Sequence, residues 1–98
     1  MRDVTELVEL RDRAYEGGVE LKNAIVNKTG KNVYDYLQMH VHKMTQAAQH
    51  GRIIEFMDEV ILFSNQFGLQ IPRALLEGMT DMRKFDVVSR SYIIGVFS

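Results

Sequence analysis

Glycine and proline are placed in this chain in a way that constrains its fold more than any other feature. Proline occurs once, at Pro72, and most of the seven glycines lie where a helix would end. Between these positions apolar residues recur every three or four residues. Neither a hairpin signal nor sustained alternation of apolar and polar residues is found. The chain is therefore predicted to be all-α.

Each segment between these breaks predicts one helix. The predicted helices run from a cap at Asp3 or Thr5 to Lys28, from Lys31 (with Asn32 a possible cap) to Gln49, from Arg52 to Gln66, from Pro72 to Gly78, and from Thr80 or Asp81 onward. At 98 residues the chain is long enough for one modest core. We expect a single domain over residues 1–98, folded as a compact four- to five-helix bundle.

Each helix is expected to bury an apolar face. The second helix would bury Val33, Leu37, Val41, Met44 and Ala48, and the third would bury Ile53, Ile54, Met57, Val60, Ile61 and Phe67. Gly17 and Gly18 interrupt the first helix, and a bend or a close helix crossing explains them. The closing run from Tyr92 to Phe97 is so apolar that it must pack against its own core or a neighbouring subunit.

Composition excludes several classes of protein. The chain is 46% hydrophobic and 26% charged, which is typical of a folded globular protein. It has no cysteine, so disulfides and thiolate metal sites are excluded. No apolar run approaches the roughly 18 residues of a membrane span, and the N-terminus MRDVTELVEL lacks a secretory apolar core. We expect a soluble, cytoplasmic protein.

No residue pattern predicts catalysis or a metal site. His40 and His42 would point about 200° apart on a helix, so they cannot bind one ion together. Glu55, Asp58 and Glu59 are best explained as a solvated acidic face. Phosphate loops, nucleophile elbows and zinc motifs are absent from the sequence. We therefore expect a protein that is not an enzyme and carries no metal and no cofactor.

The segment HVHKMTQAAQHGR, from His40 to Arg52, contains all three histidines of the chain. On one continuous helix, the polar residues from Lys31 to Arg52 would form a stripe about 32 Å long, opposite the apolar face. The only acid in that stripe would be Asp35, at its edge. The candidate phosphate contacts are Lys31, His42, Gln46, Gln49 and Arg52, supported by Arg83, Lys84 and Arg90 on the last helix.

The charges are distributed unevenly along the chain. Residues 30–52 and residues 82–98 each carry +2, whereas residues 53–81 carry −4. The polar stripe is open to three interpretations, which are a solvated surface, a nucleic-acid contact and a protein interface. Because the whole chain carries only −1, it is expected to bind nucleic acid weakly when alone.

A longer pattern spans residues 30–98. It consists of NVYDYLQMHVHKMTQAAQHGR followed by FMDEVILFSNQFGLQIPRALLEGMTDMRKFDVVSRSYIIGVFS, with its Ile71-Pro72 turn and closing aromatic-apolar-Gly run. This pattern resembles the C-terminal helical region of the large subunits of type I CRISPR effector complexes (Cascade), chiefly type I-B-like ones. In several such systems that region is also made as a separate small subunit. The resemblance implies a non-catalytic subunit, present in several copies along the guide RNA–target DNA hybrid.

The leading hypothesis is therefore a small subunit of a type I CRISPR surveillance complex. Its partners would be the backbone and large subunits, copies of itself, and the guide RNA–target DNA hybrid or the displaced DNA strand. The rival hypothesis is a small all-α adaptor, or a homo-oligomeric phage or plasmid protein, that acts through protein–protein contacts. A free-standing DNA-binding regulator ranks third, because the expected second helix begins with only Lys31 and Asn32 as base-reading residues.

Overall fold

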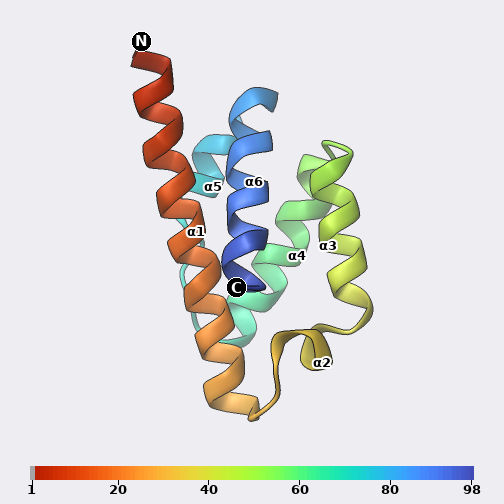
Figure 1. Ribbon diagram of the computed structural model, residues 1–98. Coiled ribbons are helices and arrows are strands. Elements are labelled where there is room, and N and C mark those ends of the chain that lie inside the picture. The colour runs from red at the N-terminus through yellow and green to blue at the C-terminus, as the bar shows by residue number, and fades with distance from the viewer. Residues whose placement is uncertain (1) are drawn as a thin grey trace.

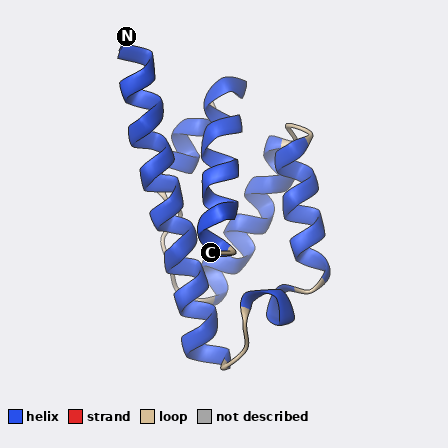
Figure 2. Ribbon diagram, in the orientation of Figure 1, coloured by secondary structure: helices blue, strands red, loops and turns tan. Residues whose placement is uncertain are grey.

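The computed structural model describes residues 2–98, and every regular element among them is a helix (Figures 1 and 2). The helices are α1 (Arg2–Thr29), α2 (Val33–Leu37), α3 (Met39–Gln49), α4 (Ile53–Gln66), α5 (Arg73–Gly78) and α6 (Met82–Val96). The prediction of an all-α helical bundle is confirmed. The described residues form six helices where four or five were expected, because the second predicted helix is divided in two.

Helices α1 and α6 lie side by side and run in the same direction, with α3 on the far side of α6 (Figure 1). Helix α4 returns antiparallel to α3 and, with α5, lies behind this front layer. Apart from the break at Gln38, the helices end where the sequence predicts breaks. Gly30, Gly51 and Gly68 all have φ near +70°, which only glycine adopts readily. Pro72 caps α5, and the side chain of Asp81 caps α6 as predicted.

The start of α1 differs from the prediction. This helix begins at Arg2, so Asp3 and Thr5 both lie inside it and neither is its cap. Gly17 and Gly18 do not break the helix either. A side-chain carbon added at Gly18 would overlap the carbonyl oxygen of Tyr92, and one added at Gly17 would overlap the ring of Pro72. The two glycines therefore mark close approaches to α6 and to the start of α5, which confirms the helix-crossing explanation.

The core is centred on the aromatic ring of Phe56. Its centroid lies 5.5 Å from that of Phe85 and 6.0 Å from that of Tyr92, both in edge-to-face geometry. Tyr92 is only 1% exposed, and its hydroxyl group shares a hydrogen bond with Ser64. The apolar C-terminal run thus packs against its own core through Tyr92, Gly95 and Val96, whereas Ile94 is 60% exposed.

The single helix predicted from Lys31 to Gln49 is wrong. Asn32 caps a first short helix, with its side chain accepting a hydrogen bond of 2.8 Å from the Asp35 amide, but Gln38 then takes φ 48° and ends it. The break lets the two tyrosines of α2 reach rings elsewhere. Tyr34 lies 4.9 Å from Phe97, and Tyr36 lies 5.6 Å from Phe67. Tertiary aromatic contacts therefore outweigh the local preference for a continuous helix.

The predicted inward face of α4 is partly wrong. Ile54 is 73% exposed and Ile61 is 38% exposed, although both were expected in the core. Phe56 and Phe63, two residues later in each case, are buried instead. Residues two apart on a helix point to nearly opposite sides, so burying the phenylalanines turns the isoleucines outward. Burial of the larger rings determines the orientation of the helix.

Candidate interaction surfaces

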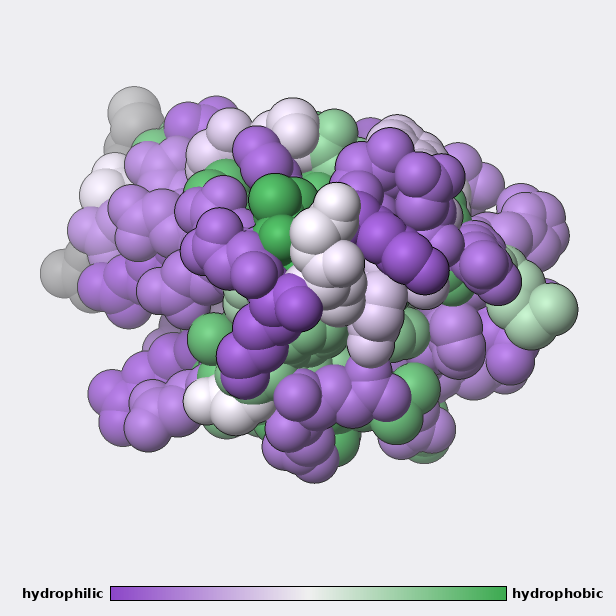
Figure 3. Space-filling view, turned by 90° about the horizontal axis from the view of Figure 1, so that it is seen from below, coloured by the Kyte–Doolittle hydropathy of each residue, from purple (hydrophilic) through white to green (hydrophobic). Residues whose placement is uncertain are grey.

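The break at Gln38 divides the predicted stripe. Lys31 lies in the turn between α1 and α2, at the lower end of the molecule, away from the turn that joins α3 to α4 (Figure 1). Seen from below, that end is mostly hydrophilic, with a few hydrophobic patches (Figure 3). Lys31 is exposed, but it does not continue the line of polar residues on α3. The stripe of about 32 Å is therefore not one straight surface.

Three of the predicted contacts line a groove between α3 and α4, called here the α3–α4 groove. Its volume is about 460 Å³. The groove is lined by His42, Lys43, Gln46, Arg52, Glu55, Asp58 and Glu59. The last three residues supply carboxylates opposite the basic side chains. This acidic wall comes from α4, so a helical wheel drawn for residues 31–52 alone did not reveal it.

A hydrogen bond and an ion pair, each involving a glutamate of α4, occupy polar groups in or beside this groove. His40 Nδ1 lies 2.8 Å from Glu59 Oε2, and the His40 ring also packs edge-on against Phe63 at 5.0 Å. Arg52 lies 3.6 Å from Glu55, with both side chains largely exposed. His40 therefore has a structural role between α3 and α4. A nucleic acid entering the groove would meet three carboxylates as well as three basic groups.

Gln49 lies elsewhere, in a second groove between α3 and α6, called here the α3–α6 groove. This groove has a volume of about 210 Å³ and brings Gln49 together with Arg90, two of the predicted contacts. The remaining lining residues are Thr45, Ala48, Ile93 and Ile94. The floor is thus mostly apolar, with one cationic side chain at its edge.

The two other basic residues predicted on α6 lie near the start of that helix. Lys84 Nζ is 2.9 Å from Glu6 Oε1, and this hydrogen bond, together with the charge of Glu6, raises the pKa of Lys84 above its usual value. Arg83 is exposed. Arg90, two turns further along, pairs with Asp86 at 3.2 Å on an exposed surface, where such a pair contributes little stability. The predicted basic residues therefore do not converge on one site.

The structure shows one surface that sequence reasoning missed. Ile54, Ile61 and Leu62 project outward from α4, with Asp58 between them on the same face. We call these four residues the α4 strip. An apolar groove of about 460 Å³, lined in part by Ile53, Ile54 and Met79, lies where α4 begins and α5 ends. The unusually high aliphatic content of the segment IIEFMDEVILF was the available signal.

Within residues 2–98, no three histidine, aspartate or glutamate side chains come together in a way that would hold a metal ion. No helix in the described part of the chain is both long and apolar enough to cross a membrane. No family model matches the chain, and neither curated proteins nor solved structures gave a match.

Proposed function

We propose that this protein is a non-catalytic assembly module that acts by binding other protein chains. The observation that carries the proposal is the α4 strip. Helix α4 buries its aromatic face in the core, and it also presents three large aliphatic side chains to solvent. This arrangement corresponds to the all-α adaptor hypothesis raised by the sequence.

The composition of the strip distinguishes it from an ordinary surface. Isolated apolar side chains are common on soluble proteins and need no explanation. Here Ile54 and Ile61 lie two helical turns apart on one face, next to Leu62, and Ile54 borders the groove that contains Met79. Contiguous apolar surface with a polar rim is typical of protein interaction sites. Glu55 supplies charge at the edge of the strip, and Asp58 supplies it between the aliphatic side chains.

A photo-crosslinking residue in place of Ile54, introduced in the producing cells, tests this function. We expect a product of defined mass that resists nuclease and is lost when Ile61→Asp is added on the same strip. The same crosslinker at Glu20, an exposed position on α1, is the matched control and should give no such product. Absence of a product at position 54 would contradict the proposal.

A second candidate follows from the resemblance to CRISPR small subunits, with nucleic acid as the ligand. The meeting of Gln49 and Arg90 at the α3–α6 groove supports it, because both side chains donate hydrogen bonds suited to phosphate. In an effector complex such contacts would support a hybrid that base pairing already holds. A crosslinker at Gln49 that gives a nuclease-sensitive product would favour this candidate over the first.

A further inference from the structure

We propose that the protein binds a second copy of itself head to tail, with the α4 strip of one copy seated against α6 and the α3–α6 groove of the next. This inference rests on the proposed function and identifies the partner. In the contact, an isoleucine of the α4 strip enters the groove, and Asp58 meets Arg90 of the other copy. Shape and charge both support this arrangement.

The projecting half of the contact is the α4 strip. Ile54 is the most exposed large hydrophobic side chain of the described residues, at 73%. Asp58 lies one turn after it and makes no ion pair with any residue that the structure describes. The strip therefore presents an aliphatic side chain on each side of an unpaired carboxylate.

The receiving half lies along α6. Its outer face carries Arg83, Val87, Arg90 and Ile94, which recur at spacings of four, three and four residues and so share one side of the helix. We call these four residues the α6 strip. It borders the α3–α6 groove, whose volume is about 210 Å³ and whose lining is mostly apolar. Since a cavity of about 150 Å³ suffices to bind benzene, this groove has room for an isoleucine side chain.

The charges of the two halves are opposite. The segment that contains the α4 strip, residues 53–81, carries −4, and the segment that contains the α6 strip, residues 82–98, carries +2. Two α4 strips facing each other would bring Glu55 and Asp58 against the same acids of the other copy. Pairing α4 with α6 avoids that repulsion and places Asp58 against the arginines of the α6 strip. Arg90 can exchange its exposed partner Asp86 for Asp58 at small cost, because exposed pairs contribute little.

The two halves lie on opposite sides of the molecule. Phe56 of α4 and Tyr92 of α6 point toward each other across the core, with ring centroids 6.0 Å apart. Ile54 and Ile94 are each two residues from one of these rings, so each points away from the core on its own helix. Figure 1 shows α4 behind α6 in the bundle. The α4 strip of one copy therefore cannot contact the α6 strip of the same copy. The contact is heterologous, so each copy keeps a free surface to which a further copy can bind.

Charge reversal tests this contact on the purified full chain. We expect wild-type mass to rise with concentration, and Asp58→Arg or Arg90→Asp each to weaken association roughly tenfold or more, because like charges then meet. Mixing the two variants should restore association, since the arginine introduced in one then meets the aspartate introduced in the other. The control Glu20→Arg makes the same charge change on an exposed acid of α1 and should have no effect. Light scattering after gel filtration measures the mass, and circular dichroism verifies the fold.

Two results would overturn the inference. One is a wild-type chain that stays monomeric up to about 1 mM, the concentration that corresponds to very weak affinity. The other is charge-reversed variants that associate like wild type, or that are not rescued by mixing. If either result is found and position 54 still crosslinks to a different protein, self-association is wrong but the proposed assembly function holds. If position 54 also gives no crosslink, both the self-association and the assembly function are wrong.

Discussion

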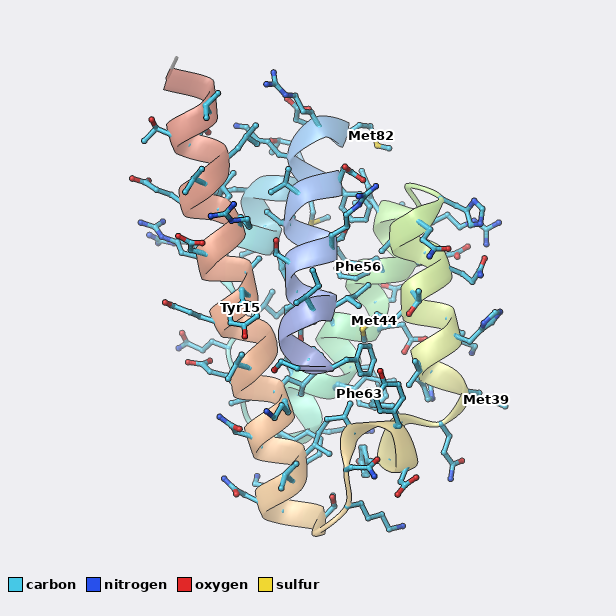
Figure 4. All side chains as sticks on the ribbon, in the orientation of Figure 1. Tyr15, Met39, Met44, Phe56, Phe63 and Met82 are labelled. Carbon is cyan, nitrogen blue, oxygen red and sulfur yellow. The ribbon has the colours of Figure 1, made fainter. Side chains whose placement is uncertain are left out.

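Gly18 of α1 and Gly95 of α6 lie against each other where the two longest helices cross. A side-chain carbon on Gly95 would overlap the carbonyl oxygen of Tyr15 and lie 3.1 Å from the Cα of Gly18. The atoms in the way belong to the backbone, so they cannot rotate aside. This contact fixes how closely α1 and α6 approach, and with it the position of the α6 strip. Figure 4 shows Tyr15 on α1 at this level of the bundle.

Replacing Gly95 with alanine should therefore destabilise the fold. Alanine favours a helix over glycine by about 1 kcal/mol, but overpacking a tight contact costs typically 1–3 kcal/mol. Because the overlapped atoms are backbone, we expect the upper end of that range and a net loss of about 2 kcal/mol, measured by urea denaturation. Asn23→Ala, at an exposed position of α1, is the control and should cause no loss. An unchanged or higher stability of Gly95→Ala would show that the helices can separate at no cost.

For a substitution at Gln38, the break between α2 and α3 predicts a change in stability opposite in sign to the change that a continuous helix predicts. Gln38 has φ 48°, a region in which a non-glycine residue is strained by roughly 1–2 kcal/mol. Gln38→Gly should therefore stabilise the protein by about 1 kcal/mol. Inside a continuous helix the same change would destabilise by about 1 kcal/mol. The sign of the change in the free energy of unfolding thus decides between the two backbones.

The break at Gln38 also shows what the sequence could and could not reveal. Gly30, Gly51 and Pro72 predicted helix boundaries correctly, because the backbone preferences of glycine and proline depend on the residue itself and not on distant contacts. Gln38 carries no such signal, since the contacts of Tyr34 and Tyr36 that favour the break come from residues more than 25 positions away. A wheel drawn through Gln38 therefore placed Lys31 on the wrong surface.

The orientation of α4 was ambiguous for a different reason. Its sequence offers apolar residues on nearly every side, so periodicity alone could not choose between Ile54 and Phe56 as the inward residue. The choice depended on the rings of Phe85 and Tyr92, which come from another helix. The sequence did not predict the acidic wall of the α3–α4 groove for the same reason, because its carboxylates come from a different helix than the polar stripe. Single-helix reasoning does not show which neighbouring helix lies opposite a polar stripe.

Tyr92 predicts a specific alkaline limit to stability. Burial raises the pKa of Tyr92 above its usual value of 10, although its hydrogen bond with Ser64 acts in the opposite direction. The folded state thus favours the neutral phenol. The corresponding stability is fully present below pH 10 and is lost as the pH rises beyond it toward the folded-state pKa. We expect helix content and one tyrosinate absorbance step to change together in a titration above pH 10.

Tyr92→Phe is the control for that titration. It removes the ionisable group but keeps the ring against Phe56, at the cost of about 0.5–1.5 kcal/mol for the hydrogen bond with Ser64. The variant should be less stable near neutral pH and should lose less stability between neutral and strongly alkaline pH. A tyrosinate step for Tyr92 that precedes loss of helix would contradict its burial.

The division of the polar stripe leads to a test of nucleic-acid binding that the intact stripe would not have suggested. We expect the isolated chain to bind single-stranded DNA weakly at physiological salt, because its net charge is −1 and its basic groups are dispersed. Any residual binding should fall with Gln49→Glu, since Gln49 shares a groove with Arg90. It should change little with His42→Glu, since His42 already faces Glu55, Asp58 and Glu59. Both residues are exposed, so neither change should alter stability by more than about 0.5 kcal/mol.

Fluorescence anisotropy across a salt titration measures the binding of single-stranded DNA by the wild type and by the two variants. Tight, salt-resistant retention, or equal losses from both variants, would mean that the two grooves act together on nucleic acid despite the acidic wall of the α3–α4 groove.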